Sequence, residues 1–183
     1  MRIVAGRFKG RRLAAPPGTA TRPTSDRVRE ALFQRLGPLD DQRVLDLFAG
    51  SGALGLEALS RGAEQATFVD SAVAAIKAIE GNVATLGLAR EQAEIRRQDA
   101  GAFLRSARAA GRQYDLVLLD PPYRHAAELG RALAPLLREV LASGGRVVSE
   151  SDRRDPLDLD PDLPPTDERR YGDTLIRIHE RTE

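Results

Sequence analysis

A glycine-rich turn between an apolar strand and a helix constrains the fold of this chain more than any other feature. Residues 46–55 read Asp-Leu-Phe-Ala-Gly-Ser-Gly-Ala-Leu-Gly and contain the pattern G-x-G-x-x-G. Glycines let the backbone turn tightly and approach a ligand closely, and the following helix N-terminus favours an anionic group. Alone, the pattern is a weak signal that a structural turn would also explain. Between a strand and a helix, it indicates a site for a nucleotide-type cofactor.

The order of predicted elements around this turn favours a doubly wound α/β sheet. Helical patterns fill the intervals between short apolar runs, and in one of them Ile76, Ile79 and Val83 share a helix face. Strands that alternate with helices form a mostly parallel sheet with helices on both faces. The apolar runs predict strands at residues 44–48, 66–69, 94–98, 116–119 and 146–149.

The N-terminal segment differs from the rest in charge and is predicted to form an extension. Two extended runs joined by glycines indicate a hairpin, and Thr24 or Ser25 can cap the helix that follows. Residues 1–35 hold nine Lys and Arg against two acidic residues. A basic arm (residues 1–36) on a mildly acidic main domain (residues 37–183) favours a polyanion partner, although such a run can also be an ordinary solvated surface.

The C-terminal part carries weaker signals. Residues 174–179 alternate apolar and polar side chains, which predicts an added antiparallel edge strand. Residues 152–165 are rich in Asp and Pro and predict a loop. Pro135 predicts a kink or a break in a helix over residues 126–142.

Acidic residues near the ends of the first three strands bear on the identity of the cofactor. Asp46 lies inside the first strand, where a buried carboxylate is costly unless a cation pairs with it. S-adenosylmethionine carries an ammonium and a sulfonium that suit Asp46, whereas the phosphates of a dinucleotide would be repelled. Asp70 ends the second strand and can accept hydrogen bonds from both ribose hydroxyls. Asp99 can accept from the adenine amino group or simply cap a helix.

The tetrad Asp120-Pro121-Pro122-Tyr123 follows the most apolar strand, at the edge where ligands bind in open α/β sheets. Prolines hold the loop extended, so the Asp120 carboxylate and the Pro121 carbonyl can accept both hydrogens of an exocyclic amine. This directs the amine lone pair at a methyl donor, and such positioning supplies much of the rate. Tyr123 offers a face on which an extruded base can stack. Without the glycine turn, an ordinary turn with an exposed Tyr would explain the tetrad equally well.

Composition excludes several other chemistries. The chain has no cysteine, which excludes disulfides, thiolate metal sites and the Cys nucleophile of cytosine-C5 methylation. Two histidines far apart disfavour a His-based metal site, so no metal is predicted. No signal peptide or membrane-length apolar segment is evident, which favours a cytoplasmic protein without a membrane partner. A monomer is the default expectation.

The two motifs together resemble those of amino-methyltransferases with an Asp/Asn-Pro-Pro-aromatic signature, whose fold is a seven-stranded, mostly parallel Rossmann-like sheet. Over nearly its whole length the chain resembles the bacterial RsmD family, with Arg-Pro-Thr at residues 22–24 as the most specific part. That family transfers one methyl from S-adenosylmethionine to the N2 amine of a guanine in small-subunit (16S) ribosomal RNA. The resemblance rests on residues 1–6, 10–13, 22–24, 27–33 and 46–63.

The resemblance implies roles for individual residues and a partner, ribosomal RNA in a partly or fully assembled small subunit. It assigns nothing to residues 152–166. The residues expected to handle the amine are Asp120, Pro121 and Tyr123. Cofactor contacts are expected from Asp46, Phe48, Gly50, Gly52, Asp70 and Asp99. Residues expected to hold RNA are Arg7, Lys9, Arg11, Arg12, Arg22 and Arg27.

Three alternative functions share parts of this pattern. An adenine-N6 methyltransferase has both motifs but normally needs a target-recognition region, for which this chain has no room. A Rossmann oxidoreductase is disfavoured by Asp46 and by the lack of a substrate domain. A non-catalytic RNA-binding protein is disfavoured by Asp120 and the intact glycine turn. Because the tetrad accommodates either amine, the preference for guanine over adenine rests on the family resemblance.

Overall fold

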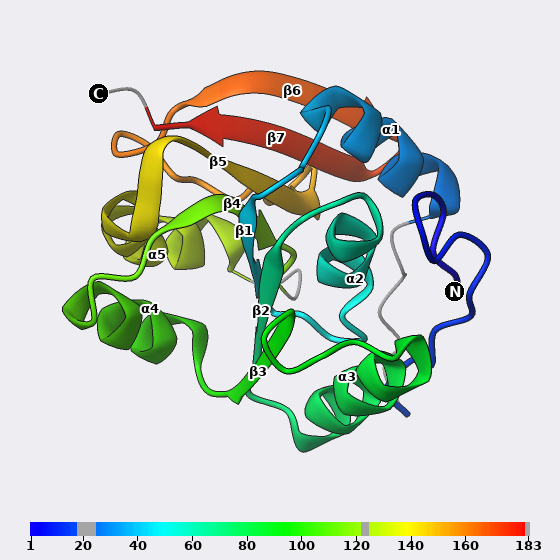
Figure 1. Cartoon of the computed structure of the whole chain (residues 1–183). Coiled ribbons are helices and arrows are strands. Elements are labelled where there is room, and N and C mark those ends of the chain that lie inside the picture. Colours follow the sequence, from blue (N-terminus) through cyan, green and yellow to red (C-terminus); the bar gives the residue numbers. More distant parts are fainter. Residues whose placement is uncertain (18–24, 122–124, 182–183) are drawn as a thin grey trace.

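The computed structural model describes residues 1–17, 25–121 and 125–181. One seven-stranded sheet runs through it in the order β3-β2-β1-β4-β5-β7-β6 (Figure 1). Strands β1 to β5 run parallel to one another, and β7 runs antiparallel to both β5 and β6. The strands are β1 (Arg43–Leu47), β2 (Gln65–Asp70), β3 (Ala93–Arg97), β4 (Tyr114–Leu119), β5 (Leu141–Asp152), β6 (Pro165–Tyr171) and β7 (Thr174–Glu180). This architecture confirms the predicted fold class.

Within the described residues, five helices cover the two faces of the sheet. One apolar cluster joins α1, α2 and α3 to sheet residues such as Leu118 and Val148. A second cluster joins α4 and α5 to residues of the opposite face, such as Val117 and Val147. The alternation of neighbouring residues between the two clusters is the period-two pattern of a strand buried on both sides. The helices are α1 (Asp26–Leu36), α2 (Ala53–Ser60), α3 (Val73–Leu86), α4 (Ala100–Ala109) and α5 (Ala126–Val140).

The N-terminal arm packs against α2 as a short hairpin. Arg2 and Arg12 form an antiparallel bridge, flanked by a hydrogen bond of 3.0 Å from the Ile3 N–H to the Arg11 carbonyl. Ile3 and Leu13 are buried in the same apolar cluster as α2. Ser25 then caps α1 by accepting a hydrogen bond from the Val28 N–H, which confirms one of the two predicted caps. The domain boundary after residue 36 stays a prediction.

The predicted place of the last strand at the edge of the sheet is wrong. β7 lies between β5 and β6, so β6 forms the edge. The sequence of β6, Pro-Thr-Asp-Glu-Arg-Arg-Tyr, is almost entirely polar, and all of its residues are exposed or only partly buried. An edge strand with this little burial carries no apolar alternation, which explains why sequence patterns missed it.

Pro135 does not break α5. The helix continues through it to Val140. Pro135 and Arg131, the residue four positions earlier, are both exposed. The carbonyl that loses its helical hydrogen bond therefore lies on the water-facing side, where solvent can replace the missing donor. None of the described helices is long and apolar enough to cross a membrane.

Candidate functional site

The predicted site residues gather at one edge of the sheet. In parallel sheets ligands bind outside the carboxyl ends of the strands, where the connecting loops begin. The glycine turn follows β1, Asp70 ends β2, Asp99 follows β3 and Asp120 follows β4. Because β1 and β4 are direct neighbours, the glycine turn and the Asp120 loop start side by side.

The glycine turn is held in a conformation that favours glycine. Phe48, Gly50 and Gly52 all have positive φ angles, of 59°, 57° and 76°. Gly52 is the N-cap residue of α2, and its N–H donates to the Ala49 carbonyl over 2.7 Å. Phe48 adopts this conformation without being a glycine, and its side chain packs on the α4–α5 cluster.

The third glycine of the motif permits close packing of α2 on the sheet. A Cβ atom at Gly55 would lie 2.4 Å from the Phe68 ring and 3.0 Å from Asp46 Oδ2. The Gly55 N–H donates to that same carboxyl oxygen over 2.9 Å. A residue larger than glycine would separate the helix from β1 and from the Asp46 carboxyl group.

Asp46 is buried, as the sequence predicts, and its side chain is 2% exposed. Burial raises the pKa of Asp46 to about 8, partly offset by the Gly55 hydrogen bond and reinforced by the charge of Asp70. The carboxyl group is therefore mostly protonated at neutral pH. A cation bound next to it would favour the charged form. This is the behaviour expected of a group whose ligand carries positive charge.

Asp70 ties the glycine turn to the end of β2. One of its oxygens accepts from the Gly50 N–H over 2.9 Å, and the other accepts from the Ala72 N–H over 2.8 Å. Each carboxylate oxygen retains a second lone pair, so these bonds leave capacity for further donors. Its contact with ribose hydroxyls stays a prediction.

Asp99 caps α4. Its carboxylate accepts from the Ala102 N–H over 3.0 Å, and its side chain is exposed at the end of β3. The sequence left two roles open for Asp99, and the structure confirms that it caps a helix. The other role, a contact with an adenine amino group, stays a prediction.

Asp120 and Pro121 leave β4 beside another acidic residue. Burial raises the pKa of Asp120 well above its usual range, and the charges of Glu150 and Asp46 add to this effect. Pro121 is buried. Tyr123, predicted to stack on a base, lies outside the described residues. Glu150, two residues before the end of β5, was missed by sequence reasoning. It directly follows the apolar run of that strand, and an acid after an apolar run is the signal that singled out Asp70 and Asp120.

The residues predicted to hold RNA line the hairpin and the start of α1. Arg7, Lys9, Arg12 and Arg27 are exposed. The Arg7 guanidinium lies 4.5 Å from the centre of the Phe8 ring. Arg11 is also exposed, and it donates to the Thr85 carbonyl over 2.7 Å. Arg22 lies outside the described residues.

Part of the positive charge of the arm is neutralised within the protein. Arg2 pairs with Asp26 over 2.9 Å, and Arg35 pairs with Asp167 over 2.8 Å. Arg29 is 1% exposed and pairs with Asp26 and with the buried Glu57. The nine basic residues counted in the sequence therefore overstate the charge that a partner can meet.

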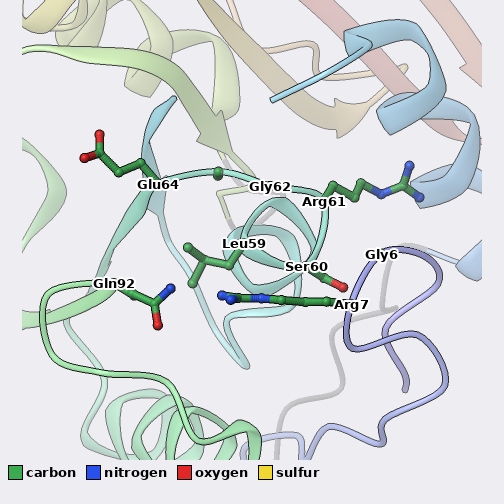
Figure 2. Close-up of a pocket in the computed structure, with 9 residues that line it drawn as sticks. Gly6, Arg7, Leu59, Ser60, Arg61, Gly62, Glu64 and Gln92 are labelled. Atoms are coloured by element: carbon green, nitrogen blue, oxygen red, sulfur yellow. The ribbon is translucent and has the colours of Figure 1, made fainter. Parts of the chain in front are cut away.

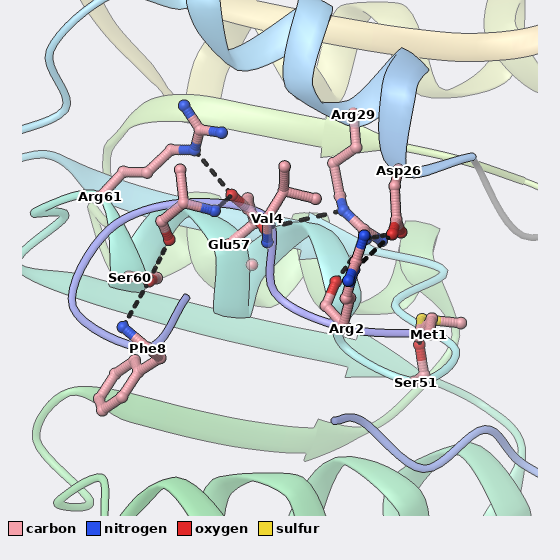
Figure 3. A network of polar contacts seen from close by, with 12 residues as sticks. Met1, Arg2, Val4, Phe8, Asp26, Arg29, Ser51, Glu57, Ser60 and Arg61 are labelled. Carbon is pink, nitrogen blue, oxygen red and sulfur yellow. Dashed lines mark hydrogen bonds and ion pairs between the residues drawn. The ribbon is translucent and has the colours of Figure 1, made fainter. Parts of the chain in front are cut away.

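The Glu57 side chain on α2 binds the backbone of the arm (Figure 3). Its two oxygens accept from the backbone N–H groups of Val4 and Ala5 over 2.8 and 3.0 Å. The same carboxylate accepts from Arg61 over 2.8 Å. Nothing in the local sequence distinguishes Glu57 from a surface glutamate on a helix, so sequence reasoning did not find this network.

A surface cavity lies beside the hairpin turn, at the amino ends of β2 and β3 (Figure 2). Its volume is about 560 Å³, and Arg7, Ser60, Glu64 and Gln92 are among its lining residues. Figure 2 shows Arg7 reaching across it, whereas Arg61 points toward α1. The cavity is at the opposite edge of the sheet from Asp46 and Asp120. In the described part of the chain, no group of three His, Cys, Asp or Glu side chains is arranged to hold a metal ion.

Comparisons with known proteins agree with this geometry. The model of the family described as Conserved hypothetical protein 95 matches residues 1–180. The chain is 42% identical over 185 residues to "Putative rRNA methyltransferase YlbH" of Bacillus subtilis, covering 99% of each chain. It is 43% identical over 125 residues to Ribosomal RNA small subunit methyltransferase D of Escherichia coli, covering 68% of this chain and 61% of that one.

A solved structure shares the whole fold. The Escherichia coli protein yhhF, described as a putative methyltransferase, superposes with a TM-score of 0.83 at 35% identity. The superposition covers 100% of this chain and 98% of the other. The similarity includes the arm as well as the sheet.

Proposed function

Because the chain belongs to the RsmD family, described as Conserved hypothetical protein 95, we propose that it methylates the N2 amine of a guanine in small-subunit ribosomal RNA. The proposed methyl donor is S-adenosylmethionine. The observation that carries the proposal is the juxtaposition of two motifs. The glycine turn with Asp46 and the loop with Asp120 and Pro121 begin at the ends of adjacent strands, β1 and β4.

The residues at the end of β1 fit a cationic cofactor. The buried Asp46 carboxyl group has its pKa raised to about 8 by burial, so it gains most from a nearby positive charge. The positive φ angles of Gly50 and Gly52 bring bare backbone to the start of α2, whose N–H groups suit a carboxylate. When bound, S-adenosylmethionine supplies a methyl group on a positively charged sulfur, together with an ammonium and a carboxylate.

Asp120 and Pro121 suit an amine acceptor. The Asp120 carboxylate and the Pro121 carbonyl accept the two N–H bonds of the guanine amine and turn its lone pair toward the methyl group. This positioning offsets the poor nucleophilicity of an amine conjugated to a base. The low polarity around Asp120, seen in its raised pKa from burial, strengthens these hydrogen bonds.

The exposed basic residues suit the RNA. Arg7, Lys9 and Arg12 on the hairpin and Arg27 on α1 lie along the flank of α2. α2 has eight residues and is therefore about 12 Å long, at about 1.5 Å per residue. The proposed partner is ribosomal RNA within a partly or fully assembled small subunit. We propose that the protein acts as a monomer.

The decisive experiment is transfer of labelled methyl from S-adenosylmethionine to small ribosomal subunits that lack this modification. Nucleoside analysis is expected to show N2-methylguanosine at one position. Naked 16S RNA and DNA serve as parallel acceptors and identify the preferred substrate. N6-methyladenosine as the product would contradict the assignment of the base. A lack of transfer to any RNA would contradict the proposed function as a whole.

A further inference from the structure

Glu150 lies beside the two carboxyl groups that the proposed function uses. β4 and β5 are parallel neighbours, with Leu118 opposite Val148 and Leu119 opposite Ser149. Asp120 and Glu150 are the next residues on these strands, so their side chains leave the same face of the sheet. Adjacent strands lie about 4.8 Å apart. The Glu150 side chain is 3% exposed.

Asp46 completes a row of three acids on this face. It lies opposite Leu118 on the other side of β4, so it shares a face with Asp120 and Glu150. The row therefore crosses three neighbouring strands, β1, β4 and β5. These residues are not arranged to hold a metal ion. Because burying negative charges close together is costly, a charged Glu150 at this place favours the protonated form of Asp120.

Three titratable groups on neighbouring elements act or lie elsewhere. Asp70 at the end of β2 acts on Asp46. His179 on β7 bonds to Ser149 on the opposite face of β5, and the β7 residue opposite Glu150 is the apolar Ile176. His125 precedes α5 and is exposed. Among the described residues, Glu150 and Asp46 are the acidic groups that raise the pKa of Asp120.

We propose that Glu150 is a positioning residue that makes the Asp120 carboxylate the acceptor of the proton released by the methylated amine. The amine nitrogen forms the new C–N bond with its lone pair, while the C–S bond breaks and leaves its electron pair on sulfur. The nitrogen then carries a positive charge and passes one proton to the Asp120 carboxylate, which later releases it to water. Glu150 acts by making Asp120 a stronger base than an ordinary aspartate. This role rests on the proposed function.

The test is the pH dependence of kcat/KM for methyl transfer by the wild type and by Glu150→Gln, which keeps the size of the side chain and removes its charge. The acid limb of this profile reports the pKa of the essential base in the free enzyme. Without Glu150, the pKa of Asp120 falls, so the limb is expected to move to lower pH by about one to two units. The plateau is expected to fall about three- to tenfold, because a weaker base takes the proton less readily.

The matched control is Glu180→Gln, the same change at an exposed position of β7. It is expected to leave both limb and plateau at their wild-type values. A loss of activity in Glu150→Gln that is equal at every pH would overturn the proposal, because a purely structural residue has that effect. If Glu150→Gln does not fold, the same pH profile is measured for Glu150→Asp. It keeps the charge but withdraws it by one methylene, and an acid limb identical to that of the wild type overturns the proposal.

The outcomes separate this proposal from the one on which it rests. A wild-type protein that transfers no methyl to RNA contradicts the proposed function. If the wild type is active and Glu150→Gln has the same acid limb in its pH profile, only the proposed role of Glu150 is contradicted, and the proposed function stands.

Discussion

At the scale of single residues, burial controls the chemistry of the acids at the carboxyl edge of the sheet. Asp46 and Asp120 have pKa values raised first of all by burial, whereas the exposed Asp99 forms an ordinary helix cap. Asp99 and Asp120 were found by their positions after strands, and Asp46 was found by its position inside one. The raised pKa values of Asp46 and Asp120 follow from burial in the folded chain, which neighbouring sequence does not encode.

Replacement of Asp120 by alanine tests the proposed handling of the amine. Asp120→Ala is expected to lower kcat for methyl transfer by a factor of about 100 or more, because it removes an acceptor that orients the nucleophile. Cofactor affinity, measured by calorimetry, is expected to stay nearly unchanged. Asp115→Ala, at the other end of β4, serves as the control and should retain turnover. A large loss of cofactor affinity in Asp120→Ala would contradict the assignment.

Asp46 is expected to make the protein less stable as the pH rises. Its folded pKa of about 8 exceeds the ordinary value of 3.8, so the folded state binds a proton that the unfolded state has released between these values. The stabilising contribution is complete below pH 3.8 and is lost as the pH rises toward 8, at about 1.4 kcal/mol per pH unit. Urea unfolding at several pH values should show this decline in the wild type and a flatter profile in Asp46→Asn. If the free energy of unfolding depends on pH in the same way for the wild type and for Asp46→Asn, this prediction is contradicted.

At the scale of elements, sequence patterns succeed where burial is regular. The five parallel strands, the glycine turn and the Ser25 cap were predicted, because apolar runs and capping residues act locally. The polar edge strand β6 was missed, since its residues pack on one neighbour and remain largely exposed. The unbroken course of α5 through Pro135 depends on which side of the helix faces water.

Two glycines in helices allow a matched test of packing. A Cβ at Gly55 in α2 would meet the Phe68 ring at 2.4 Å, whereas a Cβ at Gly81 in α3 would meet nothing within 4 Å. Gly55→Ala is therefore expected to lower the free energy of unfolding by about 1–3 kcal/mol through overpacking. Gly81→Ala is expected to raise it by about 0.5–1 kcal/mol, because alanine favours a helix. Urea unfolding measures both, and equal effects would contradict the proposed role of Gly55.

At the scale of the whole molecule, the basic arm is part of the main fold. Ile3 and Leu13 share a core with α2, and Glu57 binds the backbone of Val4 and Ala5. The same α2 begins at the glycine turn, so one helix supports the proposed cofactor site at its start and the arm along its length. This arrangement attaches the arm, with its exposed cations, to the same helix that begins at the proposed cofactor site.

Arg7 and Lys9 are expected to bind phosphates of the RNA. The double variant Arg7→Ala/Lys9→Ala should weaken RNA binding and reduce the slope of log affinity against log salt by about 0.7–0.9 for each phosphate that is no longer neutralised. Arg35→Ala removes a cation that already pairs with Asp167 and should leave the slope unchanged. Filter binding at several salt concentrations measures the slopes. The prediction fails if the double variant and the wild type have the same slope.

The sequence by itself determined the features that depend on neighbouring residues. These are the alternation of strands and helices, the glycine turn, and acids at the ends of successive strands. Parallel strands bring such ends to one edge, so most of the site followed from local pattern. Only the tertiary structure decided which distant residues meet: Glu57 with Val4, 53 positions apart, β6 with β7, and Glu150 with Asp120. The physical reason is that strand order and burial set these contacts, and both arise from packing of the whole chain.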